Sequence, residues 1–199
     1  LGLLFGRWSQ RAVEYPWVLK QIKRYVPRGA CVLDVGCAES LLSHELIAMG
    51  YCVWGIDIND YLFKPKHMNF IKRDVRNTAC RSNLFDAIVC VSTIEHIGLP
   101  TYGQVILDPD GDLKAVKELW RILKPGGYLL LTLPFAGREY RLVRGAISER
   151  QYNVQRLRLL TQGFKIVTKQ FFLPVKSNKR IVWLRVPTNV TEKVITKPS

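Results

Sequence analysis

The stretch "VLDVGCAESLLSHEL", residues 32–46, decides the fold of this 199-residue chain. It begins with apolar residues, reaches an acid at Asp34 and turns at Gly36. Apolar residues then recur at helical spacing over 40–50, and Gly50 is suited to end that helix. We therefore predict a strand, a tight turn and a helix, with the first glycine letting the backbone lie close to a ligand.

The remainder of the chain alternates strands and helices in the same way. Further strands are predicted over 51–58, 70–75, 85–92 and 128–135, and further helices over 15–26, 112–127 and 153–162. Each strand is a nearly continuous apolar run, which is typical of a parallel sheet covered on both faces. Two later apolar segments, 164–173 and 180–186, favour an antiparallel pair. We predict an α/β fold with a doubly wound, mostly parallel Rossmann-like sheet, helices on both faces and an antiparallel last strand.

The length and the hydrophobic content of 48% suit one domain over residues 1–199. Within it, residues 1–28 are expected to form an N-terminal helical lid, and 187–199 lose the apolar pattern and are expected to be a mobile tail. No apolar run approaches the roughly 20 residues of a membrane-spanning helix, and the opening apolar stretch is short for a signal peptide. We therefore expect a cytoplasmic protein.

The cysteine pattern favours reduced, buried thiols. The five cysteines are Cys31, Cys37, Cys52, Cys80 and Cys90. Their number is odd, they contain no C-x-x-C pair, and three of them (Cys31, Cys52 and Cys90) lie inside apolar runs that read as strands. We predict no metal site and no disulfide.

Positive charge is concentrated in the last third of the chain. There are 30 Lys and Arg against 16 Asp and Glu, and between Arg138 and Arg185 twelve basic residues face only two acids, Glu139 and Glu149. Two interpretations stay open: a solvated face, or attraction to an anionic substrate, a nucleic acid or a lipid surface.

Acids at the ends of two strands predict a nucleoside site. In a parallel sheet, ligands bind beyond the carboxyl ends of the strands. Asp34 can accept hydrogen bonds from a cationic group or a bound water. Asp57 closes the second strand 21 residues after Gly36, a spacing at which an acid accepts ribose hydroxyls.

A nicotinamide dinucleotide does not fit this turn. Its pyrophosphate requires G-x-G-x-x-G, of which only Gly36 is present, since Ala38 and Leu41 replace the other glycines. Glu39 occupies the place of the pyrophosphate, and two anions there would repel. A nucleoside that lacks phosphate and carries positive charge fits the acids better.

At this point an ordered set of motifs resembles a known family, the class I S-adenosylmethionine-dependent methyltransferases, in their small-molecule (type 11) branch. The motifs are "EYPWVL", "VLDVGCAES", "VWGIDIN", "FIKRDVRN", "FDAIVCVSTIEHIG", "GDLKAVKELWRILKPGGYLLLTLPF" and "RQYNVQRLRLL". They cover nearly the whole chain. The family usually has glycine where this chain has Ala38 and Ser40, which predicts a slightly displaced turn.

The resemblance implies S-adenosylmethionine as the cofactor. By resemblance, the turn from Asp34 to Ser40 holds its methionine part, Asp57 takes the ribose hydroxyls, Asp74 with Val75 meets the adenine, and Ser92 borders the site. The full set of cofactor-binding residues expected on this basis is Asp34, Gly36, Cys37, Ala38, Glu39, Ser40, Asp57, Ile58, Asp74, Val75 and Ser92.

His96 is the candidate catalytic residue. It lies in "STIEHIG" (92–98), just past the fourth strand, and an ordinary histidine pKa of about 6.5 suits a general base. The resemblance favours His96 as a base or substrate contact, with Glu95 as a polar support on the substrate side.

The segment from Arg138 to Tyr152 is expected to cover the acceptor. It follows the fifth strand and is long for a connection between packed elements. We expect Arg138, Tyr140, Arg150 and Tyr152 to face the substrate, because arginine grips phosphate or carboxylate and tyrosine stacks on a sugar or donates to it.

Three functions remain open. The first is a methyltransferase acting on a small or glycan-precursor acceptor, anionic and methylated at a sugar hydroxyl, by family-level analogy. The second is an RNA-directed methyltransferase that uses the basic last third. The third is a non-catalytic nucleoside-binding relative. Base methylation is disfavoured because "VSTIEH" replaces the usual Asn/Asp-Pro-Pro-aromatic sequence and no Pro-Cys nucleophile is present. The oligomeric state is not predicted.

Overall fold

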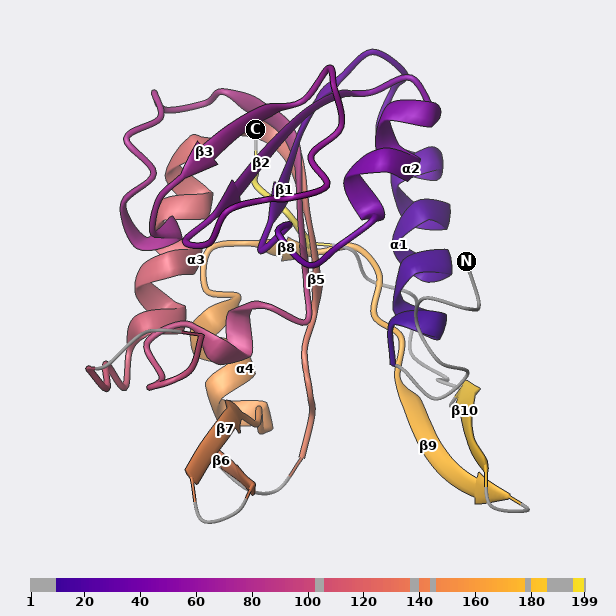
Figure 1. The fold of residues 1–199 in the computed structure, drawn as a ribbon, viewed down its shortest axis with the longest axis vertical. Coiled ribbons are helices and arrows are strands. Elements are labelled where there is room, and N and C mark those ends of the chain that lie inside the picture. Colours follow the sequence, from indigo (N-terminus) through magenta and orange to yellow (C-terminus); the bar gives the residue numbers. More distant parts are fainter. Residues whose placement is uncertain are drawn as a thin grey trace.

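A central sheet divides the molecule into two helical layers (Figure 1). The computed structural model describes residues 10–102, 106–136, 140–143, 146–177, 180–185 and 195–198. In these ranges the sheet has seven strands in the order β3-β2-β1-β4-β5-β11-β8. They are β1 (Cys31–Val35), β2 (Cys52–Asp57), β3 (Asn69–Lys72), β4 (Phe85–Val91), β5 (Leu123–Thr132), β8 (Lys165–Ile166) and β11 (Ile195–Thr196).

The strand directions confirm the predicted sheet. β1 pairs in parallel with β2 and β4, β2 with β3, and β4 with β5. β11 runs antiparallel to both β5 and β8. The expected mobile tail at 187–199 is therefore wrong for residues 195 and 196, which form the strand β11; residues 186–194 and 199 lie outside the described ranges.

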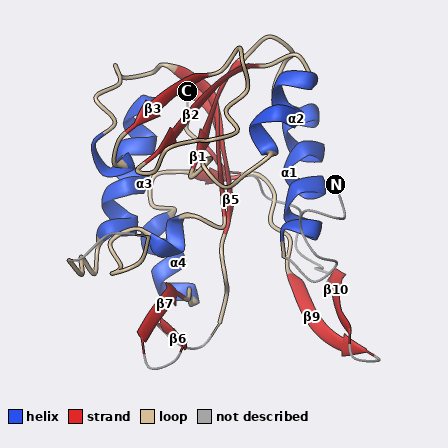
Figure 2. Cartoon of the chain, viewed as in Figure 1, coloured by secondary structure: helices blue, strands red, loops and turns tan. Residues whose placement is uncertain are grey.

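Helices cover both faces of the sheet, as predicted (Figure 2). They are α1 (Arg11–Tyr25), α2 (Leu42–Ala48), α3 (Gly111–Ile122) and α4 (Val154–Leu160). Neighbouring side chains of a strand point to opposite faces, so Val32 packs in the core with α1 and α2, whereas Leu33 packs in the core with α3. Both are fully buried, which explains why the strand reads as a continuous apolar run.

The helix α1 begins earlier than the predicted residue 15. Its first turn is fixed on the edge of the sheet, because Arg11 Nη1 donates to Glu39 O over 2.8 Å and Gln10 Nε2 donates to Ser92 Oγ over 2.7 Å. These contacts involve residues 28 and 82 positions away, so the sequence spacing within the helix could not reveal them. Pro16 consequently lies inside the helix rather than in its first turn.

The helix α3 ends at Ile122 and the strand β5 starts at Leu123, so "KPGG" (124–127) lies within the strand and not in the predicted helix over 112–127. Pro125 cannot continue a helix. In the pairing of β4 with β5, Phe85 lies opposite Leu123 and Ala87 lies opposite Tyr128, so residues 124–127 form an irregularity in the register. Lys124 Nζ anchors this irregularity by an ion pair of 2.6 Å to Asp86 Oδ1. The fifth strand is therefore longer than the predicted 128–135 at its start.

Two small antiparallel sheets complete the described fold. β6 (Tyr140–Val143) pairs with β7 (Ala146–Arg150), and β9 (Phe172–Ser177) pairs with β10 (Arg180–Arg185). The predicted antiparallel pair exists, but its first strand is β9; residues 165 and 166 belong to the main sheet instead. The hairpin of β9 and β10 projects beyond the N-terminal end of α1 (Figure 1).

The thiols are free, and Cys52 corrects one expectation. Cys37 and Cys90 are buried, whereas Cys52, the first residue of β2, is exposed. Within the described ranges, no cluster of three His, Cys, Asp or Glu residues could hold a metal ion.

The same ranges also contain no helix that is long and apolar enough to cross a membrane.

Candidate functional site

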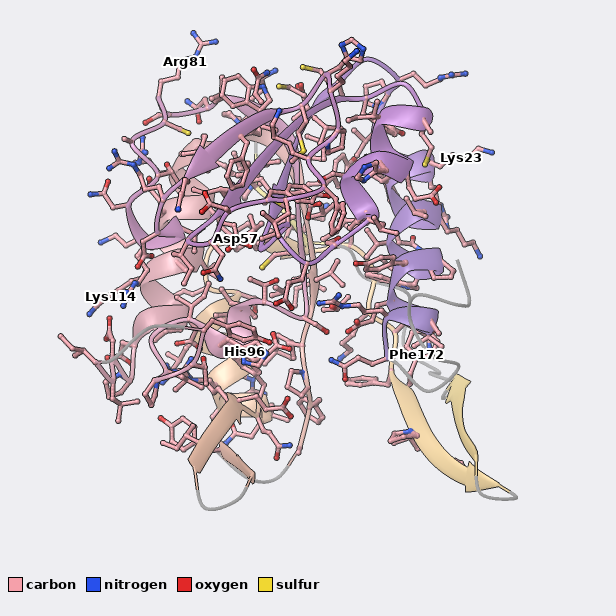
Figure 3. All side chains as sticks on the ribbon, viewed as in Figure 1. Lys23, Asp57, Arg81, His96, Lys114 and Phe172 are labelled. Carbon is pink, nitrogen blue, oxygen red and sulfur yellow. The ribbon has the colours of Figure 1, made fainter. Side chains whose placement is uncertain are left out.

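A cleft opens at the carboxyl ends of β1, β2 and β4. Its empty space, counted to its open mouth, is about 740 Å³. Nine residues of the predicted site line it: Gly36, Ala38, Glu39, Asp57, Ile58, Asp74, Val75, Ser92 and His96. Figure 3 labels Asp57 and His96, which come from the end of β2 and the segment after β4. The structure thus brings most of the predicted site to one place.

The turn after β1 accepts only glycine. Gly36 has a φ of +73°, and a Cβ placed there would lie 2.3 Å from Thr93 Oγ1. Thr93 is itself held in place, since its hydroxyl donates to Val91 O over 2.9 Å. The ends of β1 and β4 therefore touch at this point, and Thr93 lines the cleft beside Gly36.

Asp57 connects two loops of the cleft. Its Oδ2 accepts a hydrogen bond from the Ala38 amide over 3.0 Å, and its Oδ1 accepts from the Asn59 amide over 2.8 Å. The carboxylate is thus fixed in orientation while it still lines the cleft. Each oxygen keeps a lone pair that a ligand hydroxyl could use.

Asp34, Cys37 and Ser40 lie behind the turn rather than on the cleft lining. Asp34 is 2% exposed and accepts from Ser43 Oγ over 2.6 Å. Burial raises the pKa of Asp34 to about 7. Ser40 Oγ lies 2.8 Å from the hydroxyl of Tyr15, and Cys37 is fully buried. The side chains of these three residues support the shape of the turn, and the expectation that the turn holds the cofactor stays a prediction.

Asp74 is held by Arg76 at the start of the short 3₁₀ helix η1 (Val75–Asn77). Asp74 Oδ1 accepts from the Arg76 amide over 2.8 Å, and Oδ2 lies 2.6 Å from the guanidinium. Burial raises the pKa of Asp74, but the hydrogen bonds from Arg76 outweigh burial and keep that pKa below its ordinary value. Asp74 is therefore a charged, fixed acceptor on the lining.

Ser92 links the N-terminal helix to the sheet. It has a φ of +45°, which is uncommon outside glycine. Its hydroxyl accepts from Gln10 Nε2 over 2.7 Å and donates to the carboxylate of Glu14 over 2.8 Å. The Ser92 amide donates to Thr132 Oγ1 over 3.0 Å. The expected lid segment 1–28 is thus attached through Gln10 and Glu14, while residues 1–9 lie outside the described ranges.

His96 lines the cleft, and its neighbour Glu95 does not. The His96 ring meets the Tyr102 ring edge-on, with centroids 5.0 Å apart. Glu95 is fully buried, and neither of its carboxylate oxygens has a hydrogen-bond partner among the described residues. Burial raises the pKa of Glu95 well above its ordinary value. Glu95 therefore lies behind the lining, and its expected place on the substrate side stays a prediction.

Arg150 and Tyr152 are buried within the protein and do not line the cleft, so their contact with substrate stays a prediction. Arg150 is 1% exposed and donates to Ile97 O over 3.2 Å and to Pro109 O over 3.0 Å. Tyr152 is fully buried and donates to Asp112 Oδ2 over 3.1 Å. Since a buried guanidinium must satisfy its donors internally, Arg150 fastens β7 to the loop before α3.

The other two substrate candidates have different outcomes. Tyr140 is half-buried, and its ring centroid lies 5.9 Å from the guanidinium carbon of Arg150. Tyr140 is absent from the residues that line the cleft. Arg138 lies outside the described residues. The prediction that the segment from Arg138 to Tyr152 covers the acceptor therefore gains no support from the described positions of Tyr140, Arg150 and Tyr152.

The sequence interpretation missed eight residues of the lining. They are Val35, Ile56, Asn59, Arg73, Thr93, Ile97, Arg11 and Tyr102. The first six of these each stand next to a predicted residue and could have been found by adjacency. Arg11 comes from the first turn of α1 and belongs to no motif.

Comparison with known proteins agrees with this geometry. A family model described as "Methyltransferase domain" matches residues 7–169. A solved S-adenosylmethionine-dependent methyltransferase from Methanosarcina mazei is 20% identical, with a TM-score of 0.67 over 89% of this chain and 97% of that chain. The N-methyltransferase NodS from Bradyrhizobium japonicum, solved with S-adenosylhomocysteine, is 15% identical, with a TM-score of 0.66 over 96% and 90%.

A curated relative is also similar over part of its length. The ubiquinone biosynthesis O-methyltransferase of Xanthomonas axonopodis pv. citri is 32% identical over 119 residues, which are 55% of this chain and 45% of the relative. The matched region therefore spans less than half of that protein. The family model, by contrast, extends over most of this chain, from the first helix to the strand β8. The chain therefore belongs to the methyltransferase-domain family, as its resemblance to the class I S-adenosylmethionine-dependent methyltransferases predicted.

Proposed function

We propose that this chain binds S-adenosylmethionine in the cleft and transfers its methyl group to a hydroxyl of a small-molecule acceptor. The observation that carries the proposal is the Asp57 carboxylate on the lining. Its two oxygens are oriented by the amides of Ala38 and Asn59 and keep lone pairs for a ligand. An acid fixed in this way suits the two hydroxyls of a ribose.

The remaining lining fits the same cofactor. Gly36 permits a close approach to the backbone, and Glu39 opposes phosphate but favours positive charge. S-adenosylmethionine is a nucleoside without phosphate, and it supplies a methyl carbon on a positively charged sulfur.

The residues divide along the cleft by their place in the fold. Asp57 would bind the ribose. Ile58, Asp74 and Val75, which follow β2 and β3, would surround the adenine; Gly36, Ala38 and Glu39, in the turn after β1, would meet the methionine part. Methyl transfer is an in-line displacement, so these residues mainly need to fix the donor in position.

His96 is proposed as an acceptor contact or base in this reaction. It lines the cleft together with Ser92 and Thr93, in the segment that follows β4. His96→Ala should lower turnover while leaving the affinity for S-adenosylhomocysteine unchanged. Equal losses of both would instead place His96 in cofactor binding.

An anionic acceptor, such as a sugar phosphate, a lipid-linked sugar or RNA, is the second candidate. The net charge of +14 favours it, and Arg11 and Arg73 lie on the cleft lining. The O-methyltransferase relative favours a hydroxyl as the acceptor group in either case.

The direct test of the proposal is calorimetry with S-adenosylhomocysteine. Asp57→Ala removes two charge-assisted hydrogen bonds and should weaken binding by about 2 to 4 kcal/mol. Asp60→Ala is the matched control, because Asp60 is an exposed acid three positions away that pairs with Lys72 over 2.7 Å. Binding that is unaffected by Asp57→Ala would refute the assignment of the cleft. Labelled S-adenosylmethionine offered with neutral phenols, sugar phosphates or RNA then distinguishes the acceptor classes.

A further inference from the structure

A second and larger cleft adjoins the first. It lies between α1, the end of β5, β7, α4 and the segment from Ile166 to Pro174, and its empty space to the mouth is about 1,720 Å³. Figure 3 labels Phe172, which stands at the root of β9 beside this cleft. The methyltransferase resemblance assigned no residue to it.

The lining of the second cleft is mainly apolar. It includes the rings of Trp17, Phe135 and Phe171 and the aliphatic side chains of Leu131 and Leu157. The rings of Phe135 and Phe171 meet edge-on with centroids 5.4 Å apart. Phe135 is nevertheless 44% exposed, so it offers apolar surface that the described protein does not cover. Such a lining gains free energy by covering apolar groups of a ligand.

Charge in the second cleft does not favour an anion. Its described lining contains two acids, Glu14 and Glu149, and one lysine, Lys169. The ammonium of Lys169 lies 5.3 Å from the centroid of the Phe171 ring, a cation–π contact. The described lining thus has one basic side chain among mainly apolar ones, so this cleft suits an uncharged ligand better than a phosphorylated one.

A group of hydrogen bonds lies where the two clefts adjoin. Ser92 lines the first cleft, while Gln10 and Glu14 line the second. The Ser92 hydroxyl donates to Glu14 Oε1 over 2.8 Å and accepts from Gln10 Nε2 over 2.7 Å. A donor in the first cleft and an acceptor in the second would therefore meet at this group of hydrogen bonds.

The carboxyl group of Glu14 has the environment of a base. Burial raises the pKa of Glu14 above its ordinary value, although hydrogen bonds from Ser92 and Thr132 oppose the rise. The charge of Arg11 on the same helix also opposes the rise, and Glu14 lies near the buried Glu95 of the segment after β4. A carboxylate whose pKa is raised toward neutrality takes up a proton more readily.

We propose that the second cleft binds an uncharged acceptor with an apolar ring or chain, and that Glu14 takes the proton of its hydroxyl. This inference rests on the proposed function. In the step, the acceptor oxygen bonds to the methyl carbon, the carbon–sulfur bond breaks, and its electron pair stays on sulfur. The hydroxyl proton passes to the Glu14 carboxylate, so the products are a methyl ether and a neutral thioether.

Binding is tested with phenol, 4-butylphenol and 4-octylphenol, by calorimetry on the whole chain without cofactor. Because each added methylene covers apolar surface, 4-octylphenol should bind about tenfold or more tightly than 4-butylphenol. Phe135→Asp should abolish this gain, and Leu62→Asp, at an 84% exposed position outside both clefts, should preserve it. Equal affinities of the two alkylphenols, or tighter binding of glucose 1-phosphate, would overturn the proposed acceptor class.

The role of Glu14 is tested separately by Glu14→Gln, which keeps a hydrogen-bonding partner for Ser92. Binding of 4-octylphenol and S-adenosylhomocysteine should stay within threefold of wild type, while methyl transfer to 4-octylphenol falls about 100-fold or more. The loss of rate on the acid side of the wild-type pH profile should disappear in the variant. A wild-type rate and profile would overturn the role of Glu14. Failure of S-adenosylhomocysteine to bind to wild type would instead refute the proposed function, since the alkylphenol measurement needs no cofactor.

Discussion

Replacing Asp112 by Asn should lower the free energy of unfolding by about 3 to 5 kcal/mol, because it leaves buried positive charge without a counterion. Asp112 is fully buried. Its Oδ1 accepts from Arg156 Nη2 over 2.6 Å and lies 3.5 Å from Arg150 Nη1, and its Oδ2 accepts from the Tyr152 hydroxyl over 3.1 Å. Arg150 is 1% exposed, so water cannot replace the lost carboxylate.

The magnitude follows from burial, and the neighbouring Asp110 provides the control. Asp110 Oδ1 lies 3.3 Å from Arg156 Nη2, but its side chain is 62% exposed. Exposed ion pairs contribute about 0 to 1 kcal/mol, so Asp110→Asn should be close to wild type. For a chain of this length, a loss of 3 to 5 kcal/mol corresponds to a melting temperature lower by roughly 6 to 20 °C.

Urea unfolding followed by circular dichroism measures both variants. Asp112→Asn should lower the midpoint with little change in the slope m, since the surface exposed on unfolding stays similar. If Asp112→Asn and Asp110→Asn have the same stability within 1 kcal/mol, the cluster does not carry the energy assigned to it.

Two further predictions concern the first turn. Gly36→Ala places a Cβ 2.3 Å from Thr93 Oγ1 at a φ of +73°. Calorimetry should therefore show loss of S-adenosylhomocysteine binding, and urea unfolding should show lower stability. A wild-type affinity would contradict the close approach of Gly36 and Thr93. Asp34 has a raised pKa of about 7 against an ordinary 3.8, so the native state binds the extra proton. This stabilisation is present below about pH 4 and is lost as the pH rises to 7, at about 1.4 kcal/mol for each pKa unit. In Asp34→Asn the free energy of unfolding should therefore fall less between pH 4 and 7 than in wild type. If the free energy of unfolding depends on pH equally in both proteins, the raised pKa of Asp34 is contradicted.

The fold could be predicted because the central strands carry their own signal. Val32 and Leu33 are adjacent, point to opposite faces and are both fully buried. A strand covered on both sides has to be apolar throughout, so the sequence of β1 already implies two layers of helices. The acid at the end of β2 and the glycine after β1 could be assigned for a similar reason, since their positions depend on local geometry.

The partners of long side chains could not be predicted in the same way. Arg150 stands in a segment rich in positive charge, yet it reaches carbonyl groups of Ile97 and Pro109, which are 53 and 41 positions away. The bond between Ser92 and Glu14 spans 78 positions. No spacing rule links such pairs, because they arise only when the sheet brings the segments together.

The same reasoning separates the overall charge of the chain from the chemistry of its acceptor. Three described arginines near the site, Arg76, Arg150 and Arg156, bind carboxylates or carbonyl oxygens of the protein itself. Their charge still contributes to the long-range field that steers encounter with an anion. Binding, however, depends on the groups that line the cleft, and the second cleft presents aromatic rings and aliphatic side chains with a carboxyl group where the two clefts adjoin. A basic sequence is therefore compatible with an uncharged acceptor, because these three arginines are bound by the protein itself and the lining of the second cleft is mainly apolar.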